Sequence, residues 1–293
     1  GRPWLGTGFA FVAVIVNVPL NYALIWGIGP FPELGLTGAG VASFAAQCVA
    51  LAVGWLVWAR LRSLRRLRIR RQPSMAEVAA TFREGAPLGL MYLAETAAVA
   101  VATFLIGTFG TIALAANQVA MSVGGLIYMV PLGVAGAVAI RVAQEVGADN
   151  RAALRPVALA ALAVATLWLS AAALLLLFGA HRLSAVIVDE PEVVALAATI
   201  MVVFGFMQIF DGLQSTMLGA LRGMSDAGWA AMISMIAYWP VGLPLGWAFA
   251  QWWVYGAAGV WVGWLIALAW AGAMLTGRFL VKTRAGQVRE ETT

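Results

Sequence analysis

The sequence is poor in the side chains that build most catalytic and metal sites. Its 293 residues include one cysteine, one histidine and one lysine, which are Cys48, His181 and Lys282. A single cysteine excludes an intrachain disulfide framework, and one cysteine with one histidine cannot form a Cys/His zinc site. Lys282 does not follow the glycine pattern of a phosphate-binding loop, so the chain carries no Walker motif of its own. These shortages argue against an enzyme.

Charged residues are also scarce, whereas apolar residues are abundant. Only 11% of the chain is charged and 62% is hydrophobic, with a mean hydropathy of +0.90. Soluble domains average roughly 25% charged and 45–50% apolar residues. A soluble fold of this length could not hide so much apolar surface, so we expect the lipid bilayer to be its solvent.

Eight apolar runs are each long enough to cross a hydrocarbon core of about 30 Å, which requires roughly 20 helical residues. The runs are continuous rather than alternating, which favours helices over the strands of a membrane β-barrel. We therefore predict an all-α fold, a polytopic membrane helical bundle of about eight transmembrane helices. The runs cover residues 5–26, 38–59, 85–107, 115–140, 156–178, 193–218, 229–249 and 256–280.

Basic residues are strongly biased toward one side of such a bundle. Alternation of the spans places 17 of the 18 Lys and Arg residues on the side of the chain ends, with only Arg182 opposite. The positive-inside rule then predicts that both ends are cytoplasmic. The Arg60–Arg71 cluster could instead bind lipid head groups or nucleic acid, but its position at a span end favours topology. Ser74 and Glu77 form a capping box that predicts a short interfacial helix before the third span.

Two carboxylates, Glu95 and Asp211, lie near the middle of predicted spans. No Lys or Arg lies at a comparable depth in the pattern. Placing an ionised side chain at the centre of a membrane helix costs about 2.5–3.5 kcal/mol on insertion scales. Each acid is therefore expected either to be protonated or to be balanced by a bound cation, and a change of occupant would change the local charge. The alternative is that a protonated acid serves only as an interhelical hydrogen-bond donor.

Polar and adaptable side chains near these acids are candidates for lining a site. Several share a helical face with one of the acids, because residues three and four apart lie on the same side of a helix. Each amide could equally serve as a hydrogen bond between helices. The candidates are Tyr92, Asn117, Gln118, Met207, Gln208 and Gln214.

Four segments, in order along the chain, resemble the multidrug and toxic compound extrusion (MATE) transporters. The match to the fifth and sixth helices of that family is carried by Asn17-Val-Pro-Leu-Asn21 and by the run Pro32–Gly40. The seventh helix is matched by Gly85-Ala-Pro87 with Glu95, and the eighth by Ala115–Ala120, Pro131 and Ile140-Arg-Val142. The tenth helix and its loop are matched by Asp211 with Leu218–Gly223.

The resemblance implies that the chain is a fragment that contains helices five to twelve of a bacterial member. Residues 1–62 would then be the last two helices of the N-terminal lobe, and 63–84 a basic cytoplasmic linker with the interfacial helix. Residues 85–280 would be the complete six-helix C-terminal lobe, and 281–293 a cytoplasmic tail. The opening Gly1-Arg2-Pro3-Trp4, without an initiator methionine, agrees with a fragment.

For function, the resemblance implies a secondary antiporter in the bacterial inner membrane that exports organic cations in exchange for Na⁺ or H⁺. It would need no cofactor beyond the coupling ion, have no nucleic-acid partner and act as a monomer when full length. Glu95 and Asp211 match the family's cation-site acids and would hold Na⁺ if sodium is the ion. Met207 departs from the pattern, because some sodium-coupled members carry tyrosine there. The alternatives are a lipid-linked oligosaccharide flippase of the same superfamily, a membrane-embedded enzyme, or an inactive truncated fragment.

Overall fold

The computed structural model describes residues 4–60, 74–252 and 256–290, and every regular element in these ranges is helical. The chain divides into two compact units, Gly1–Ser74 and Met75–Thr293. The division lies within the stretch 63–84 that the sequence assigns to a linker. The arginines of the basic cluster beyond Arg60 lie outside the described residues.

The first unit is a helical hairpin of α1 (Trp4–Trp26) and α2 (Gly35–Arg60). Gly27, Gly29 and Gly35 adopt positive φ in the connection, a conformation that glycine reaches without steric cost. Gly38 brings the two backbones into contact, because a Cβ there would lie 2.5 Å from the carbonyl oxygen of Leu24. Such close approach through small residues is typical of helix pairs in membranes.

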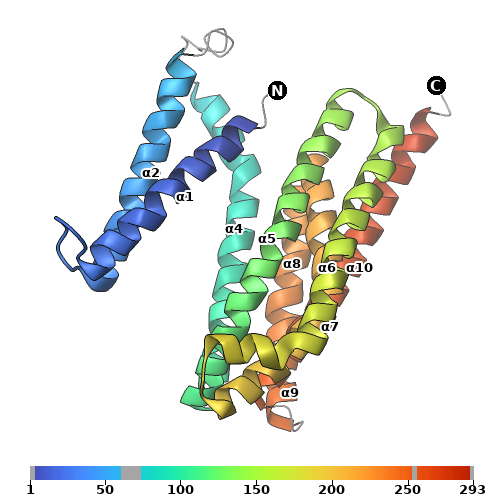
Figure 1. Ribbon diagram of the computed structural model, residues 1–293. Helices are drawn as coiled ribbons and strands as arrows, with labels where there is room; N and C mark the ends of the chain where they lie inside the picture. The colour runs from blue at the N-terminus through green and yellow to red at the C-terminus, as the bar shows by residue number, and fades with distance from the viewer. Residues whose placement is uncertain (1–3, 61–73, 253–255, 291–293) are drawn as a thin grey trace. The chain divides into compact units, whose positions relative to one another are not determined.

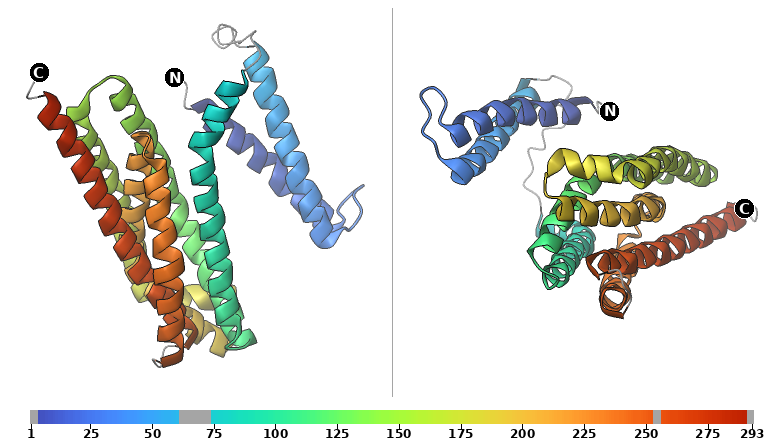
Figure 2. Two further views of the ribbon diagram at one scale, coloured as in Figure 1. Left: turned by 180° about the vertical axis from the view of Figure 1, so that it is seen from behind. Right: turned by 60° about the horizontal axis from the view of Figure 1, so that its bottom comes forward.

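The second unit is a bundle of long helices that run side by side (Figure 1, Figure 2). In chain order these are α4 (Met75–Gly107), α5 (Thr111–Gly147), the 3₁₀ turn η1 (Arg151–Ala153), α6 (Leu154–Ile187) and α7 (Pro191–Gly223). The last part contains α8 (Ala227–Ile236), the π-helical segment η2 (Ala237–Gly242), α9 (Leu243–Trp252) and α10 (Gly256–Glu290). Helix α7 packs against α5, α6 and α10, so it occupies the centre of this unit.

Helices α4 and α10 are longer than the predicted spans. The expected interfacial helix and the third span form one continuous helix, which passes through Gly85 and Pro87. A proline in a helix removes a single backbone donor, and a long membrane helix can tolerate that loss. Helix α10 likewise continues to Glu290, into the stretch assigned to a tail.

Glycines allow the closest helix contacts of the second unit. A Cβ on Gly219 of α7 would lie 2.3 Å from the carbonyl oxygen of Ala135 in α5. The contact between α9 and α10 is equally tight, since a Cβ on Gly263 would lie 2.1 Å from the backbone nitrogen of Gly246 and one on Gly259 would lie 2.7 Å from the Phe249 carbonyl oxygen. Both contacts join backbone to backbone, so no side-chain movement can make room for a larger residue.

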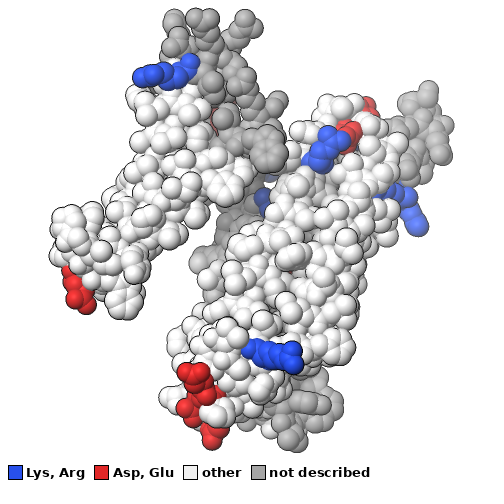
Figure 3. Space-filling model, viewed as in Figure 1, with Lys and Arg blue, Asp and Glu red and all other residues white. Residues whose placement is uncertain are grey.

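Eight helices in the described residues are long and apolar enough to cross a membrane. Many large apolar side chains on them are exposed, among them Leu36, Phe178 and Val186, each more than 80% exposed. On the face drawn in Figure 3 the charged residues lie near the helix ends, and the long middle part is uncharged. The prediction of an all-α membrane bundle with eight spans is confirmed, and the chain is a multi-pass membrane protein.

The loop between α7 and α8 carries a buried ion cluster. Asp226 is 6% exposed, and its carboxylate accepts hydrogen bonds from Arg278 Nη2 at 2.9 Å and from Lys282 Nζ at 3.1 Å. The Arg278 guanidinium also lies 4.7 Å from the ring centroid of Trp229. Burial alone would raise the pKa of Asp226, but the hydrogen bonds and charges of Arg278 and Lys282 outweigh it and hold the pKa below its usual value. The cluster fastens the α7–α8 loop to α10.

Candidate functional site

The candidate site is a cavity of about 160 Å³ inside the second unit. Its walls come from α4, α5, α7, η2 and α10, so segments far apart in the sequence meet around it. The lining residues are Glu95, Val99, Met121, Gly124, Gly125, Tyr128, Phe204, Met207, Gln208, Asp211, Tyr238, Trp261, Trp264 and Leu268. None of these described lining residues is Lys or Arg.

Both mid-span acids line this cavity. Glu95 reaches it from α4 and Asp211 from α7, and each side chain is half-buried. The two carboxyls line the same cavity, so their ionised forms would repel. The structure therefore brings together the two acids that the sequence singled out, in a site where no basic residue of the lining offsets their charge. A proton or a cation can supply that balance.

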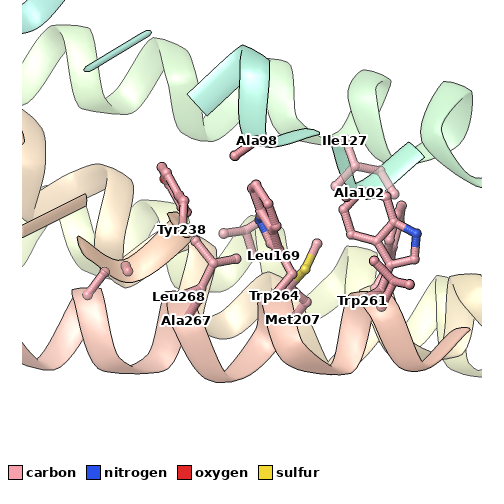
Figure 4. Close-up of a cluster of buried hydrophobic side chains, with 14 of the residues drawn as sticks. Ala98, Ala102, Ile127, Leu169, Met207, Tyr238, Trp261, Trp264, Ala267 and Leu268 are labelled. Carbon is pink, nitrogen blue, oxygen red and sulfur yellow. The ribbon is translucent and has the colours of Figure 1, made fainter. Parts of the chain in front are cut away.

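Aromatic rings form one wall of the cavity. Tyr238 stacks on Trp264 with ring centroids 4.9 Å apart and an interplanar angle of 8°. Trp261 stands edge-on to Trp264 at 5.9 Å and to Phe204 at 5.0 Å. Figure 4 shows Tyr238, Trp264 and Trp261 together with the buried side chains around them. Aromatic faces attract cations, and the effect is larger where water is excluded.

Two amides hold this aromatic wall in place. Gln214 Nε2 donates to the Tyr238 hydroxyl oxygen at 3.1 Å and to Ser234 Oγ at 3.3 Å. Asn117 Oδ1 accepts the indole N–H of Trp261 at 2.9 Å. Both amides were candidates for lining the site, but the structure places them behind the wall, where they orient the rings.

The other candidates fall into two groups. Met207 and Gln208 line the cavity, and Gln208 is 2% exposed with an Oε1 atom that has no hydrogen-bond partner among the described residues. The structure places Tyr92 and Gln118 elsewhere: both side chains are exposed, and the Tyr92 hydroxyl accepts a hydrogen bond from Arg222 Nη1 at 3.3 Å.

Five aromatic residues of the cavity were missed by the sequence analysis. They are Tyr128, Phe204, Tyr238, Trp261 and Trp264. For Tyr238, the sequence offered one signal, which is a proline two residues later, Pro240. This proline lies in the π-helical segment η2, and π-helical bulges often accompany functional sites. The two tryptophans are three residues apart on α10 and so share a face, but this spacing does not separate a cavity wall from ordinary packing.

The donor set suits a small hard cation or a proton. Two carboxyls, two phenol hydroxyls and one free amide oxygen all present oxygen atoms, which bind alkali and alkaline-earth cations better than transition metals. The described residues contain no group of three His, Cys, Asp or Glu side chains that could hold a metal ion.

Comparison with known proteins identifies the family. The family model MatE matches residues 87–248, which include both acids and most of the cavity wall. The chain belongs to the MATE family of transporters. Within this family it is 37% identical to the "Probable multidrug resistance protein NorM" of Deinococcus radiodurans, over 98% of this chain and 64% of the relative. A protein of the same name from Rhizobium meliloti is 34% identical over 92% of this chain and 59% of the relative.

Solved MATE structures share the fold. A crystal structure of the Vibrio cholerae MATE transporter VcmN in the bent form aligns with 97% of this chain and 63% of that one, with a TM-score of 0.78 and 20% identity. A eukaryotic MATE transporter, AtDTX14, aligns with 96% of this chain and 64% of that one, with a TM-score of 0.81 and 22% identity. The MATE chain described here spans about three-fifths of the length of these relatives.

Proposed function

We propose that this chain is the ion-coupling part of a secondary antiporter that exports organic cations in exchange for Na⁺ or H⁺. The observation that carries the proposal is the pair Glu95 and Asp211 in one aromatic-walled cavity without a basic lining residue. Two half-buried carboxylates in the middle of a membrane, with no basic residue among the described lining, are costly, so the binding of a cation or proton there is favoured. No cofactor beyond the coupling ion is required.

Coupling follows from competition for the same charge. When the carboxyls hold protons or a sodium ion, the cavity is neutral or nearly so and attracts an organic cation weakly. When that occupant leaves, the negative charge returns, and a cationic drug gains both the charge interaction and contact with the aromatic faces. Alternating access of such a site to the two sides of the membrane gives exchange rather than leakage. The positive-inside pattern further supports an orientation with both chain ends in the cytoplasm.

The cavity disfavours the flippase alternative. A lipid-linked oligosaccharide carries a diphosphate, which needs basic or N–H donors around it. The described lining instead contains two acids and no Lys or Arg, so a diphosphate would meet negative charge without a basic partner. The same lining fits a cationic substrate.

Transport in right-side-out membrane vesicles loaded with dye tests the proposal, with the protein expressed from its complete coding sequence. Glu95→Gln and Asp211→Asn each remove a charge at nearly constant volume, and we expect either change to abolish ion-driven efflux of a cationic dye. Glu192→Gln is the matched control, because Glu192 is an exposed acid in the first turn of α7. Ion-driven efflux at the control rate in both cavity variants would refute the coupling role.

A further inference from the structure

A separate cavity, of about 920 Å³, lies between α4, the end of α7 and the start of α8. Two arginines line it, Arg83 from α4 and Arg222 from the last turn of α7. None of its described lining residues is Asp or Glu. Both arginines lie at the ends of spans, on the side that the basic pattern predicts to be cytoplasmic. The cavity is therefore positively charged at the level of the lipid head groups.

The charges of these two arginines are not neutralised within the described part of the chain. Arg222 donates one N–H, from Nη1, to the uncharged hydroxyl of Tyr92 at 3.3 Å, and a guanidinium has four further N–H donors. Arg83 is exposed, and the ion pairs that the described residues form include neither arginine. The positive-inside rule accounts for arginines at a span end, but it does not require two of them in one cavity.

The start of α8 adds backbone donors to the same cavity, because Ala227 and Gly228 line it. The first N–H groups of a helix have no partner within that helix, and they favour an anion. Asp226 occupies the N-cap position, but its side chain does not cap the helix, because its carboxylate is bound by Arg278 and Lys282. Two cations thus offset the charge of Asp226, so it does not counteract the attraction of the cavity for an anion.

An apolar groove continues from this cavity toward the middle of the membrane. It is lined by Leu90 of α4 and by a strip of α8 and η2 that begins at Gly228 and ends at Pro240. The cavity and the groove share Pro87 and Gly228, so they adjoin. From Gly228 to Pro240 a helix advances about 18 Å, which is close to the roughly 15 Å depth of one leaflet of the hydrocarbon core.

The groove is open and makes no polar demand on an occupant. Leu90, Met232 and Trp239 are 56%, 41% and 40% exposed. The described lining side chains are apolar, and the indole N–H of Trp239 already donates to the backbone carbonyl oxygen of Ala94 at 3.1 Å. An apolar chain can therefore lie in the groove without leaving a polar atom of the lining unpaired.

We propose that Arg83 and Arg222 bind the phosphate of an anionic phospholipid, one of whose acyl chains lies in the groove along α8 and η2. The site is cationic at the span end and apolar for the depth of one leaflet, which is the order of chemistry in such a lipid, and basic pockets between membrane helices bind anionic head groups. A free phosphate would leave the groove empty, and an apolar helix would leave both arginines unneutralised. The proposal does not depend on ion coupling by Glu95 and Asp211.

Lipid titration of the full-length protein, purified in detergent and followed by native mass spectrometry, tests the proposal. We expect one saturable site for phosphatidylglycerol, with binding at least about fivefold tighter than that of phosphatidylcholine, whose head group has no net charge. Arg83→Gln and Arg222→Gln should each weaken phosphatidylglycerol binding about fivefold. Arg155→Gln is the matched control, because Arg155 lies at a span end on the same side, has no acidic partner among the described residues and does not line the cavity. It should leave the affinity unchanged.

A second pair of variants tests the groove. A Cβ on Gly228 meets no atom within 4 Å, so Gly228→Phe can fill the junction of cavity and groove without a backbone collision. It should abolish the saturable phosphatidylglycerol site. Gly277→Phe is the same change at an exposed glycine of α10 that also meets open space, and it should leave the site intact.

Three results would overturn the proposal. Equal weakening in Arg155→Gln and in the two cavity variants would show a general attraction between charges rather than a site. Displacement of the lipid by glycerol 3-phosphate at equal concentration would show a site for a soluble phosphate. A full-length protein without saturable binding would show that another part of the protein covers the groove.

Discussion

The ion cluster at the α7–α8 loop yields a quantitative stability prediction. Asp226→Asn removes the negative charge that Arg278 and Lys282 share, while the shape of the side chain is almost unchanged. Loss of one partner from a fully buried ion pair costs about 3–5 kcal/mol. Because the Arg278 and Lys282 side chains are 26% and 38% exposed, water takes over part of the solvation of their charges. We therefore expect a loss of about 2 kcal/mol, between the buried and exposed limits.

Thermal unfolding of the purified chain in detergent measures this loss. At about 2–4 °C per kcal/mol for a unit of this size, Asp226→Asn should lower the Tm by about 4–8 °C at pH 7. Asp149→Asn is the matched control: its carboxylate also meets an arginine, at 3.5 Å, but is 87% exposed. That control should shift the Tm by less than about 2 °C.

The pH dependence checks the electrostatic origin. The folded-state pKa of Asp226 lies below its unfolded value, so its stabilisation is complete above the unfolded pKa of about 3.9. It is lost as the pH falls through the lower folded-state pKa. The Tm difference between Asp226→Asn and the unmodified chain should therefore vanish in strong acid. A difference that persists there, or one no larger than that of Asp149→Asn, would refute the reasoning.

Two further predictions concern the packing. Gly263→Ala should destabilise the chain by about 1–3 kcal/mol, because the added Cβ would overlap the backbone of α9. Gly277→Ala is the control, because a Cβ there meets open space. In the same thermal assay it should be neutral or slightly stabilising. Asn117→Leu should cost only about 1 kcal/mol, since it leaves the Trp261 N–H without its acceptor but also removes a buried Asn117 Nδ2 atom that has no partner among the described residues. A loss above 3 kcal/mol would contradict that balance.

The fold was predictable because the membrane imposes a simple rule on the sequence. A span needs a continuous apolar run of sufficient length, and the eight runs correspond to the eight helices in the described part of the chain that are long and apolar enough to cross a membrane. The two acids were predictable for a related reason, since an ionisable side chain in the middle of such a run is costly and therefore informative. Which helices pack together was not predictable, because lipid-facing and buried faces are both apolar.

The aromatic wall of the cavity could not be predicted from the sequence. Thirteen tryptophans are spread over the chain, and nothing local distinguishes Trp261 and Trp264 from those that face lipid. Adjacent amides pose the same difficulty: Asn117 is buried and Gln118 is exposed, because neighbouring residues on a helix point about 100° apart. Only the rotation of α5 in the bundle decides between them. Tyr92 was chosen for its spacing from Glu95, yet its hydroxyl lies with Arg222.

The glycine contacts between α9 and α10 have a mechanical consequence. Two backbones this close behave as one stiff body, because neither can slide or tilt without collision. The irregular turn of η2 lies directly ahead of that body along the chain, with α8 on its other side. A change of curvature at η2 would therefore move α9 and α10 together and would not bend one against the other.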